Sequence, residues 1–185
     1  MTRRSALLGG FALAVAACTS DNTSLATDSG TTDDASVDAA GTTDTTGAGE
    51  AVEAVDFTYT DFEGETLTFS ELSDGPVVLN FLASWCPTCI AELPDFETVS
   101  QNLGDQVQFL GLATQDGLED SARLLEQTGV TFPVGRDPDG AIFTLFGGFS
   151  MPTTVFITAD GTIANVHSGV LTEQALTEAI NSNLL

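Results

Sequence analysis

A pair of cysteines separated by two residues constrains the fold of this chain more than any other feature, because it follows closely on an almost continuous apolar run. The run covers residues 77–82 and lacks the polar alternation of a half-solvated strand, which is typical of a strand covered on both faces. Cys86 and Cys89 come next, and Pro87 between them suits the first position of a helix, where no backbone donor is needed. The sequence therefore predicts a buried strand that leads into a helix, with the cysteines at the junction.

Strand and helix patterns continue on both sides of this junction. Alternating apolar residues around a Glu63-Gly64-Glu65 turn predict a small hairpin before the apolar run. After the cysteines, apolar residues recur at helical spacing, and Pro94 is expected to kink that helix. The remaining predicted elements are strands at 107–113, 130–134, 153–159 and 162–167, and helices at 118–127, at 141–146 and from Thr172. This order predicts an α/β domain with a central mixed sheet flanked by helices and an N-terminal β-hairpin extension.

The charge balance of the chain is strongly acidic. There are 27 Asp and Glu against 4 Lys and Arg, all four of them arginine. Hydrophobic residues still make up 42% of the 185 residues, which is enough for one packed core. A surface of this charge repels the phosphates of nucleic acids and the headgroups of anionic lipids, so we expect no nucleic-acid partner. The charge itself favours solubility or adaptation to salt over a specific cationic partner.

The first 17 residues have the layout of a secretory signal peptide: a basic start, an apolar run and small residues before Cys18. The apolar run is shorter than the roughly 20 residues that a membrane-spanning helix needs. Val15-Ala16-Ala17-Cys18 resembles the lipobox of bacterial lipoproteins, in which the cysteine is acylated and becomes the new N-terminus. The resemblance implies that a lipid on Cys18 anchors the chain to the outer face of the bacterial cell membrane. The paired arginines near the start leave the general secretory and twin-arginine export routes both open.

Residues 18–53 are predicted to be a disordered acidic tether. They are dominated by Thr, Ser, Asp, Ala and Gly and contain no aromatic residue, so they cannot bury enough apolar surface to offset the entropy of ordering. Repulsion between their like charges favours an extended chain. The predicted organisation is a signal peptide at 1–17, a lipid-anchored tether at 18–53 and one domain at 54–185.

A Cys-x-x-Cys pair serves two main chemistries, structural zinc binding and thiol–disulfide exchange. A zinc site needs further ligands, and the chain offers only His167 and no other cysteine once Cys18 is acylated. For exchange, a helix N-terminus favours the thiolate of Cys86, which we expect to attack, and Cys89 lies one turn later to resolve the mixed disulfide. A purely structural bridge would constrain the unfolded chain little, because its loop is so short. The residues therefore favour redox chemistry and predict no metal.

Three stretches of the chain resemble TlpA/ResA-like membrane-tethered thioredoxins of the AhpC/TSA-redoxin superfamily, in their lipoprotein form, over residues 56–185. The match combines the strand before the cysteines, a short motif in the following helix and a proline that opens a later strand. The stretches are Val77-Val78-Leu79-Asn80-Phe81-Leu82-Ala83-Ser84-Trp85-Cys86-Pro87-Thr88-Cys89, then Glu92-Leu93-Pro94, and Met151-Pro152-Thr153-Thr154-Val155-Phe156-Ile157 with Asp160-Gly161. The resemblance implies a thioredoxin-like fold, with no cofactor beyond a redox-active Cys86–Cys89 disulfide.

The resemblance also implies roles for residues around the cysteines. Met151-Pro152 should be a cis peptide that faces the pair, with the Met151 backbone pairing with a substrate segment. Glu92 should accept or relay the proton of Cys89, a solvated helix glutamate being the alternative. Trp85 should shield the sulfurs and offer an apolar contact to partners.

Two further polar residues, Asn80 and His167, lie on predicted strands. Asn80 occupies the strand position where those proteins carry a buried aspartate, so proton handling should shift to Glu92 or to water. This departure argues against a general cytosolic reductase. His167 falls on a strand and is interpreted as structural.

The resulting functional prediction is an extracytoplasmic thiol–disulfide oxidoreductase that reduces or isomerises disulfides of exported proteins, for example in cytochrome c maturation. By resemblance, a membrane electron donor of the DsbD/CcdA type recharges it, and we expect a monomer.

Three alternatives remain open at this point. A disulfide-forming oxidant would need a strongly acidic Cys86, and Thr88 supplies no positive charge for it. A peroxiredoxin needs Thr or Ser where Ala83 stands. A copper metallochaperone would use Cys86 and Cys89 with either Met151 or His167 as soft ligands, and its cysteines are usually spaced one residue wider.

Overall fold

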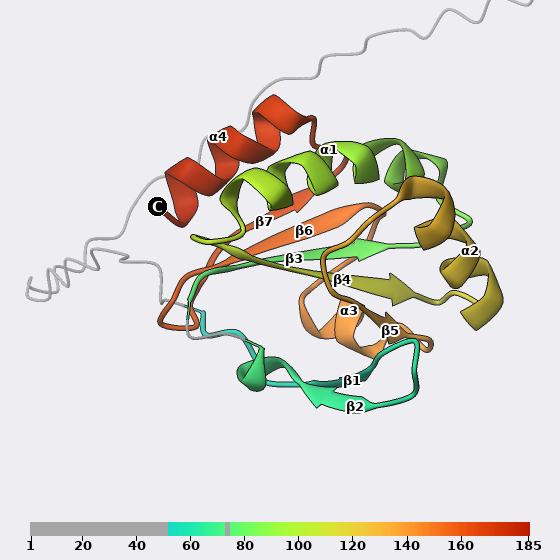
Figure 1. Ribbon diagram of the computed structural model, residues 1–185. Coiled ribbons are helices and arrows are strands. Elements are labelled where there is room, and N and C mark those ends of the chain that lie inside the picture. Colours follow the sequence, from blue (N-terminus) through green and yellow to red (C-terminus); the bar gives the residue numbers. More distant parts are fainter. Residues whose placement is uncertain (1–51, 73–74) are drawn as a thin grey trace, which may run out of the picture. The chain divides into compact units, whose positions relative to one another are not determined.

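The computed structural model describes residues 52–72 and 75–185 (Figure 1). The predicted signal peptide, Cys18 and nearly all of the tether lie outside the described residues. In the part that is described, no helix is both long and apolar enough to cross a membrane. The elements are β1 (Thr58–Thr60), β2 (Thr66–Thr68), the 3₁₀ turn η1 (Phe69–Glu71), β3 (Val77–Leu82), α1 (Pro87–Leu103), β4 (Gln108–Thr114), α2 (Leu118–Thr128), β5 (Val134–Asp137), α3 (Ala141–Leu145), β6 (Thr153–Ile157), β7 (Ile163–Ser168) and α4 (Glu173–Asn183).

The strands form one mixed sheet of seven in the order β2-β1-β5-β4-β3-β6-β7. The central strand β3 runs parallel to β4 and antiparallel to β6, and β4 runs parallel to β5. The N-terminal hairpin β1–β2 joins the edge through a single pair, Thr60 with Arg136. Because every residue of β3 is buried, the apolar run needs no polar alternation. The predicted α/β class, mixed sheet and hairpin extension are confirmed.

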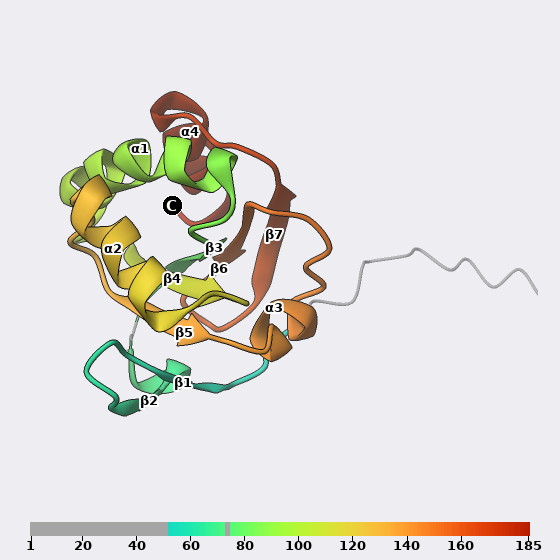
Figure 2. The ribbon, with the colours of Figure 1, turned by 90° about the vertical axis from the view of Figure 1, so that its right-hand side faces the viewer.

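Helices cover both faces of this sheet. In Figures 1 and 2, α1 and α4 lie side by side over one face, and α3 lies against the other. Side chains of β3 alternate between the two resulting cores: Val78 and Leu82 pack with α1, α2 and α4, whereas Leu79 and Phe81 pack with α3 and β1. The strand that carries the cysteine junction is thereby fixed from both sides.

One predicted element is misplaced. We expect a strand at residues 130–134, but β5 begins only at Val134. Pro133 has no N–H to give to a ladder, so pairing with β4 starts beyond it, and its carbonyl accepts the N–H of Gly111 at 2.9 Å. Phe132 is buried and packs in the core under α1 instead. Pro94 does not end α1, which continues to Leu103.

The end of β5 positions α3 through one buried carboxylate. Asp137 is 2% exposed and accepts the backbone N–H groups of Ile142 and Phe143 at 3.1 and 2.9 Å. Asp137→Ala leaves both donors without this partner, and we expect the unfolding free energy to fall by about 2 kcal/mol in urea denaturation at pH 7. The control is Asp139→Ala, because Asp139 is exposed and accepts only the N–H of Ala141. Equal losses in the two variants would contradict the capping role.

Candidate active site

Cys86 and Cys89 lie at the predicted junction between β3 and α1. Cys86 is the N-cap residue of α1, Pro87 follows it inside the first turn, and the two cysteines form a disulfide with Cα atoms 5.3 Å apart. Cys86 is 4% exposed and Cys89 is fully buried, so only the first sulfur is open to a partner. The Cys86 sulfur accepts the N–H of Cys89 at 3.1 Å and lies 3.3 Å from the Thr88 hydroxyl. Both groups can stabilise a thiolate at Cys86 after reduction.

A cis peptide bond joins Met151 and Pro152 at the start of β6. The carbonyl of Pro152 accepts the N–H of Gly169 at 2.9 Å, which ties this turn to the end of β7. Met151 and Cys86 line the same groove, of about 460 Å³, so the turn and the first cysteine face a common space. The residues that line the groove are Trp85, Cys86, Pro87, Thr88, Gln115, Phe143, Phe149, Ser150 and Met151.

Glu92 is buried in α1, one turn beyond Cys89, with only 1% of its surface exposed. Its Oε1 accepts the Asn80 amide N–H at 3.1 Å, and its Oε2 accepts the backbone N–H of Leu171 at 3.1 Å. Burial raises the pKa of Glu92 to about 7; the two hydrogen bonds offset part of this effect, and Asp95 adds to it. The burial excludes the alternative of a solvated helix glutamate. A carboxyl with this pKa exchanges protons readily near neutral pH.

Asn80 lies on the face of β3 that packs against α1, beneath Glu92. Its amide nitrogen also donates to the Thr154 hydroxyl at 3.2 Å, while its Oδ1 has no hydrogen-bond partner among the described residues. Asn80 therefore holds the neighbouring carboxylate through a hydrogen bond. Asn80 itself does not ionise.

A pair of contacts that the sequence does not reveal fixes the loop before the cysteines. The backbone N–H and hydroxyl of Ser84 donate to the Asp116 carboxylate at 2.6 and 2.7 Å. The indole N–H of Trp85, which is 54% exposed, donates to the carbonyl of Gln115 at 3.0 Å. Residues that directly follow neighbouring parallel strands meet at one edge of the sheet. This rule could have indicated from the sequence that Gln115 and Asp116 lie near the loop before the cysteines.

His167 lies on β7 opposite Thr154 and does not line the groove. No group of three or more His, Cys, Asp or Glu side chains that could hold a metal occurs within residues 52–72 and 75–185.

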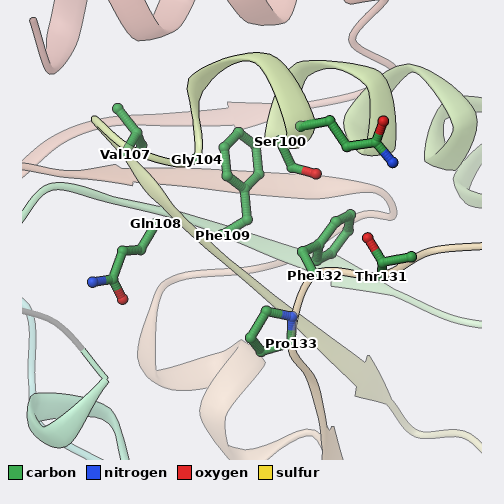
Figure 3. A pocket seen from close by; sticks show the side chains of 9 residues that line it. Ser100, Gly104, Val107, Gln108, Phe109, Thr131, Phe132 and Pro133 are labelled. Atoms are coloured by element: carbon green, nitrogen blue, oxygen red, sulfur yellow. The ribbon is translucent and has the colours of Figure 1, made fainter.

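A second cavity, of about 280 Å³, lies at the other end of α1. Figure 3 shows its lining, with Phe109 and Phe132 below the last turns of the helix. Their ring centroids are 5.9 Å apart, and Thr131 at the rim donates its N–H and hydroxyl to Glu97 of α1. Burial alone would raise the pKa of Glu97, but hydrogen bonds from Thr131 and Gln101 outweigh it and lower that pKa. No cysteine lines this cavity, which leaves the groove at Cys86 as the candidate active site.

The sequence matches known families over most of the domain. Residues 51–166 match the AhpC/TSA family. The chain is 33% identical over 132 residues to the thiol-disulfide oxidoreductase ResA of Halalkalibacterium halodurans, which covers 71% of this chain and 74% of that protein. It is 26% identical over 133 residues to ResA of Bacillus subtilis, covering 71% of this chain and 74% of that protein.

Solved structures agree with this match. A secreted disulfide oxidoreductase of Mycobacterium tuberculosis, described as homologous to Escherichia coli DsbE, superposes with a TM-score of 0.63 at 27% identity and covers 68% of this chain and 95% of its own. The exposed lipoprotein thioredoxin of Streptococcus pneumoniae superposes with a TM-score of 0.59 at 27% identity, covering 69% of this chain and 99% of its own. The predicted thioredoxin-like fold is confirmed. With its cysteine pair at the head of α1, this chain belongs to the AhpC/TSA family as a ResA-like thiol–disulfide oxidoreductase.

Proposed function

We propose that this oxidoreductase works outside the cytoplasm and passes electrons to exported proteins, as a reductant or isomerase of their disulfides. The observation that carries the direction of flow is the electrostatics of the groove. None of the residues that line it is cationic, so no positive side chain of the groove adds to the stabilisation of the Cys86 thiolate by the helix N-terminus and the Thr88 hydroxyl. A strong oxidant needs a much more stabilised thiolate, because that stability favours its reduced form.

The reaction follows from the unequal exposure of the two sulfurs. In the reduced protein, the Cys86 thiolate attacks one sulfur of a substrate disulfide, forms a mixed disulfide and releases the other substrate sulfur as a thiolate, which takes up a proton. Cys89 then attacks the Cys86 sulfur, which restores the disulfide seen here and frees the second substrate thiolate. Two electrons pass to the substrate, and an external dithiol must return them.

We assign the proton of Cys89 to Glu92 during the second step. Cys89 is fully buried and Glu92 follows it by one helical turn, so bulk water reaches neither sulfur nor carboxylate freely. The pKa of about 7 lets Glu92 take the proton as the thiolate forms and release it afterwards.

The substrate segment should lie along Met151. Its backbone N–H and C=O make no hydrogen bond within the described residues, and Met151 borders the groove at Cys86. An extended segment that pairs with this backbone would hold its cysteine against the Cys86 sulfur.

The cellular setting of the proposal rests on the N-terminal residues and on relatives. Residues 1–17 would direct export, a lipid on Cys18 would anchor the chain, and residues 18–53 would space the domain at 54–185 from the membrane. A neighbour in structure is described as an exposed lipoprotein, which supports the anchor. In this setting the electron donor is a membrane protein of the DsbD/CcdA type, the substrates include apocytochrome c cysteines, and the protein acts as a monomer.

The reduction potential of the Cys86–Cys89 couple tests this proposal. We expect a value at or below about −250 mV when the full chain is equilibrated with dithiothreitol or glutathione buffers and the thiols are quantified by alkylation. A value near about −120 mV would instead indicate a disulfide-forming oxidant. Absence of a reversible couple would overturn the redox function as a whole.

A further inference from the structure

Phe149 is the most exposed large apolar side chain among the described residues, with 83% of its surface accessible. Its backbone is nevertheless held on both sides. The N–H groups of Gly147 and Gly148 donate to the carbonyls of Thr144 and Phe143 at 3.0 and 2.9 Å. The carbonyl of Ser150 accepts the Thr153 hydroxyl at 2.7 Å. The ring therefore projects from an ordered turn.

The packing beneath this turn leaves the ring no place in the core. A Cβ atom added at Gly148 would lie 2.2 Å from the ring of Phe143, which shows how closely that ring fills the space under the loop. Phe143 packs in turn against Phe81 of β3, with ring centroids 5.3 Å apart. The exposed Phe149 ring is therefore available to a molecule that enters the groove.

The groove beside Phe149 is uncharged in a strongly acidic chain. The protein has 27 Asp and Glu, yet none lines this groove. Trp85, which is half-exposed, Met151 and Phe149 give it an apolar character around the Cys86 sulfur. An anionic side chain entering here would lose water without gaining a partner, whereas an apolar side chain would gain contacts.

We propose that Phe149 determines substrate specificity, by selecting polypeptide segments that carry a bulky apolar side chain within two residues of the reactive cysteine. The occupant of the groove is the substrate segment itself, because Cys86 can reach a substrate sulfur only if the neighbouring residues enter the groove. This inference rests on the proposed function and names the class of substrate that the site prefers. Phe149 acts on binding and takes no part in electron transfer.

Single-turnover kinetics of the reduced full chain test the inference. The substrates are two synthetic peptides of equal length, each with one internal disulfide, that differ only in a leucine or a serine beside the first cysteine. We expect the wild-type protein to reach half-saturation at a roughly tenfold lower concentration of the leucine peptide, with similar maximal rates. Phe149→Ser should abolish this preference, and Phe149→Leu should largely keep it.

Two controls separate the specificity role from other effects. Val166→Ser removes a half-exposed apolar side chain on β7 outside the groove, and it should keep the preference. Reduction of hydroxyethyl disulfide, which carries no bulky apolar side chain, should proceed at the same rate in the wild type and in Val166→Ser. Equal half-saturation for the two peptides in the wild type, with hydroxyethyl disulfide still reduced, would overturn this inference alone. Loss of exchange with every disulfide would overturn the proposed function.

Discussion

Cys86→Ser is expected to lower thiol–disulfide exchange at least about a thousandfold, to the background rate, because the attacking sulfur is gone. Cys89→Ser should have a different outcome. Its Cys86 thiolate can still attack, but no second sulfur resolves the product, so mixed disulfides with substrates accumulate. The unequal exposure of the two residues, 4% for Cys86 and none for Cys89, gives this order of events.

Mass spectrometry after acid quenching and alkylation distinguishes the two variants. The Cys89→Ser protein should gain the mass of one substrate peptide at a single site, and the Cys86→Ser protein should gain none. The Cys18→Ser protein, purified in detergent, is the control and should exchange disulfides at the wild-type rate, since Cys18 precedes the domain. Trapping by Cys86→Ser instead of Cys89→Ser would reverse the proposed roles.

The free energy of unfolding of the oxidised protein is expected to fall as the pH rises from about 4.5 to about 7, through the titration of Glu92. Its pKa is about 7 in the folded chain against an ordinary value of 4.5. The folded state therefore binds this proton more tightly than the unfolded state does. The stability that the protonated form provides is present below about pH 4.5 and is lost as the pH passes through about 7. The shift corresponds to roughly 3 kcal/mol.

Urea denaturation of the wild type and of Glu92→Gln at pH 5 and pH 8 measures this contribution. The glutamine imitates the protonated carboxyl, so the unfolding free energy of the variant should not fall between pH 5 and pH 8 through this group. The variant should therefore be more stable than the wild type at pH 8. The free Oδ1 of Asn80 can accept the new amide after the asparagine side chain turns over. Glu126→Gln, on the exposed face of α2, is the matched control and should keep the wild-type dependence. A Glu92→Gln profile parallel to that of the wild type would show that Glu92 is not the group responsible.

Local patterns predicted the part of the site that lies within one stretch of chain. An apolar run, a proline between two cysteines and a helical repeat are properties of neighbouring residues, and they placed Cys86 at the head of α1 correctly. The resemblance added the cis bond before Pro152, which the structure has. The prediction of a strand at 130–134 was wrong, because β5 begins only at Val134. Apolar content does not show which backbone N–H groups a strand needs for pairing, and Pro133 has no N–H.

Features that depend on contacts between distant segments were not predicted from the sequence. The Ser84–Asp116 contact forms only because β3 and β4 run parallel and end at the same edge. The burial of Glu92 depends on α4 and the preceding loop closing over α1, which brings the Leu171 N–H to its carboxylate. The exposure of Phe149 follows no periodic pattern, because Phe149 lies in a turn between α3 and β6.

The hydrogen bond between the Trp85 indole and the Gln115 carbonyl has a practical consequence. The chain contains a single tryptophan, and this bond fixes it directly beside Cys86. Disulfides quench the fluorescence of nearby indoles, so the tryptophan emission of the protein follows the state of one covalent bond. The molecule therefore carries an optical reporter of its own oxidation, without any label.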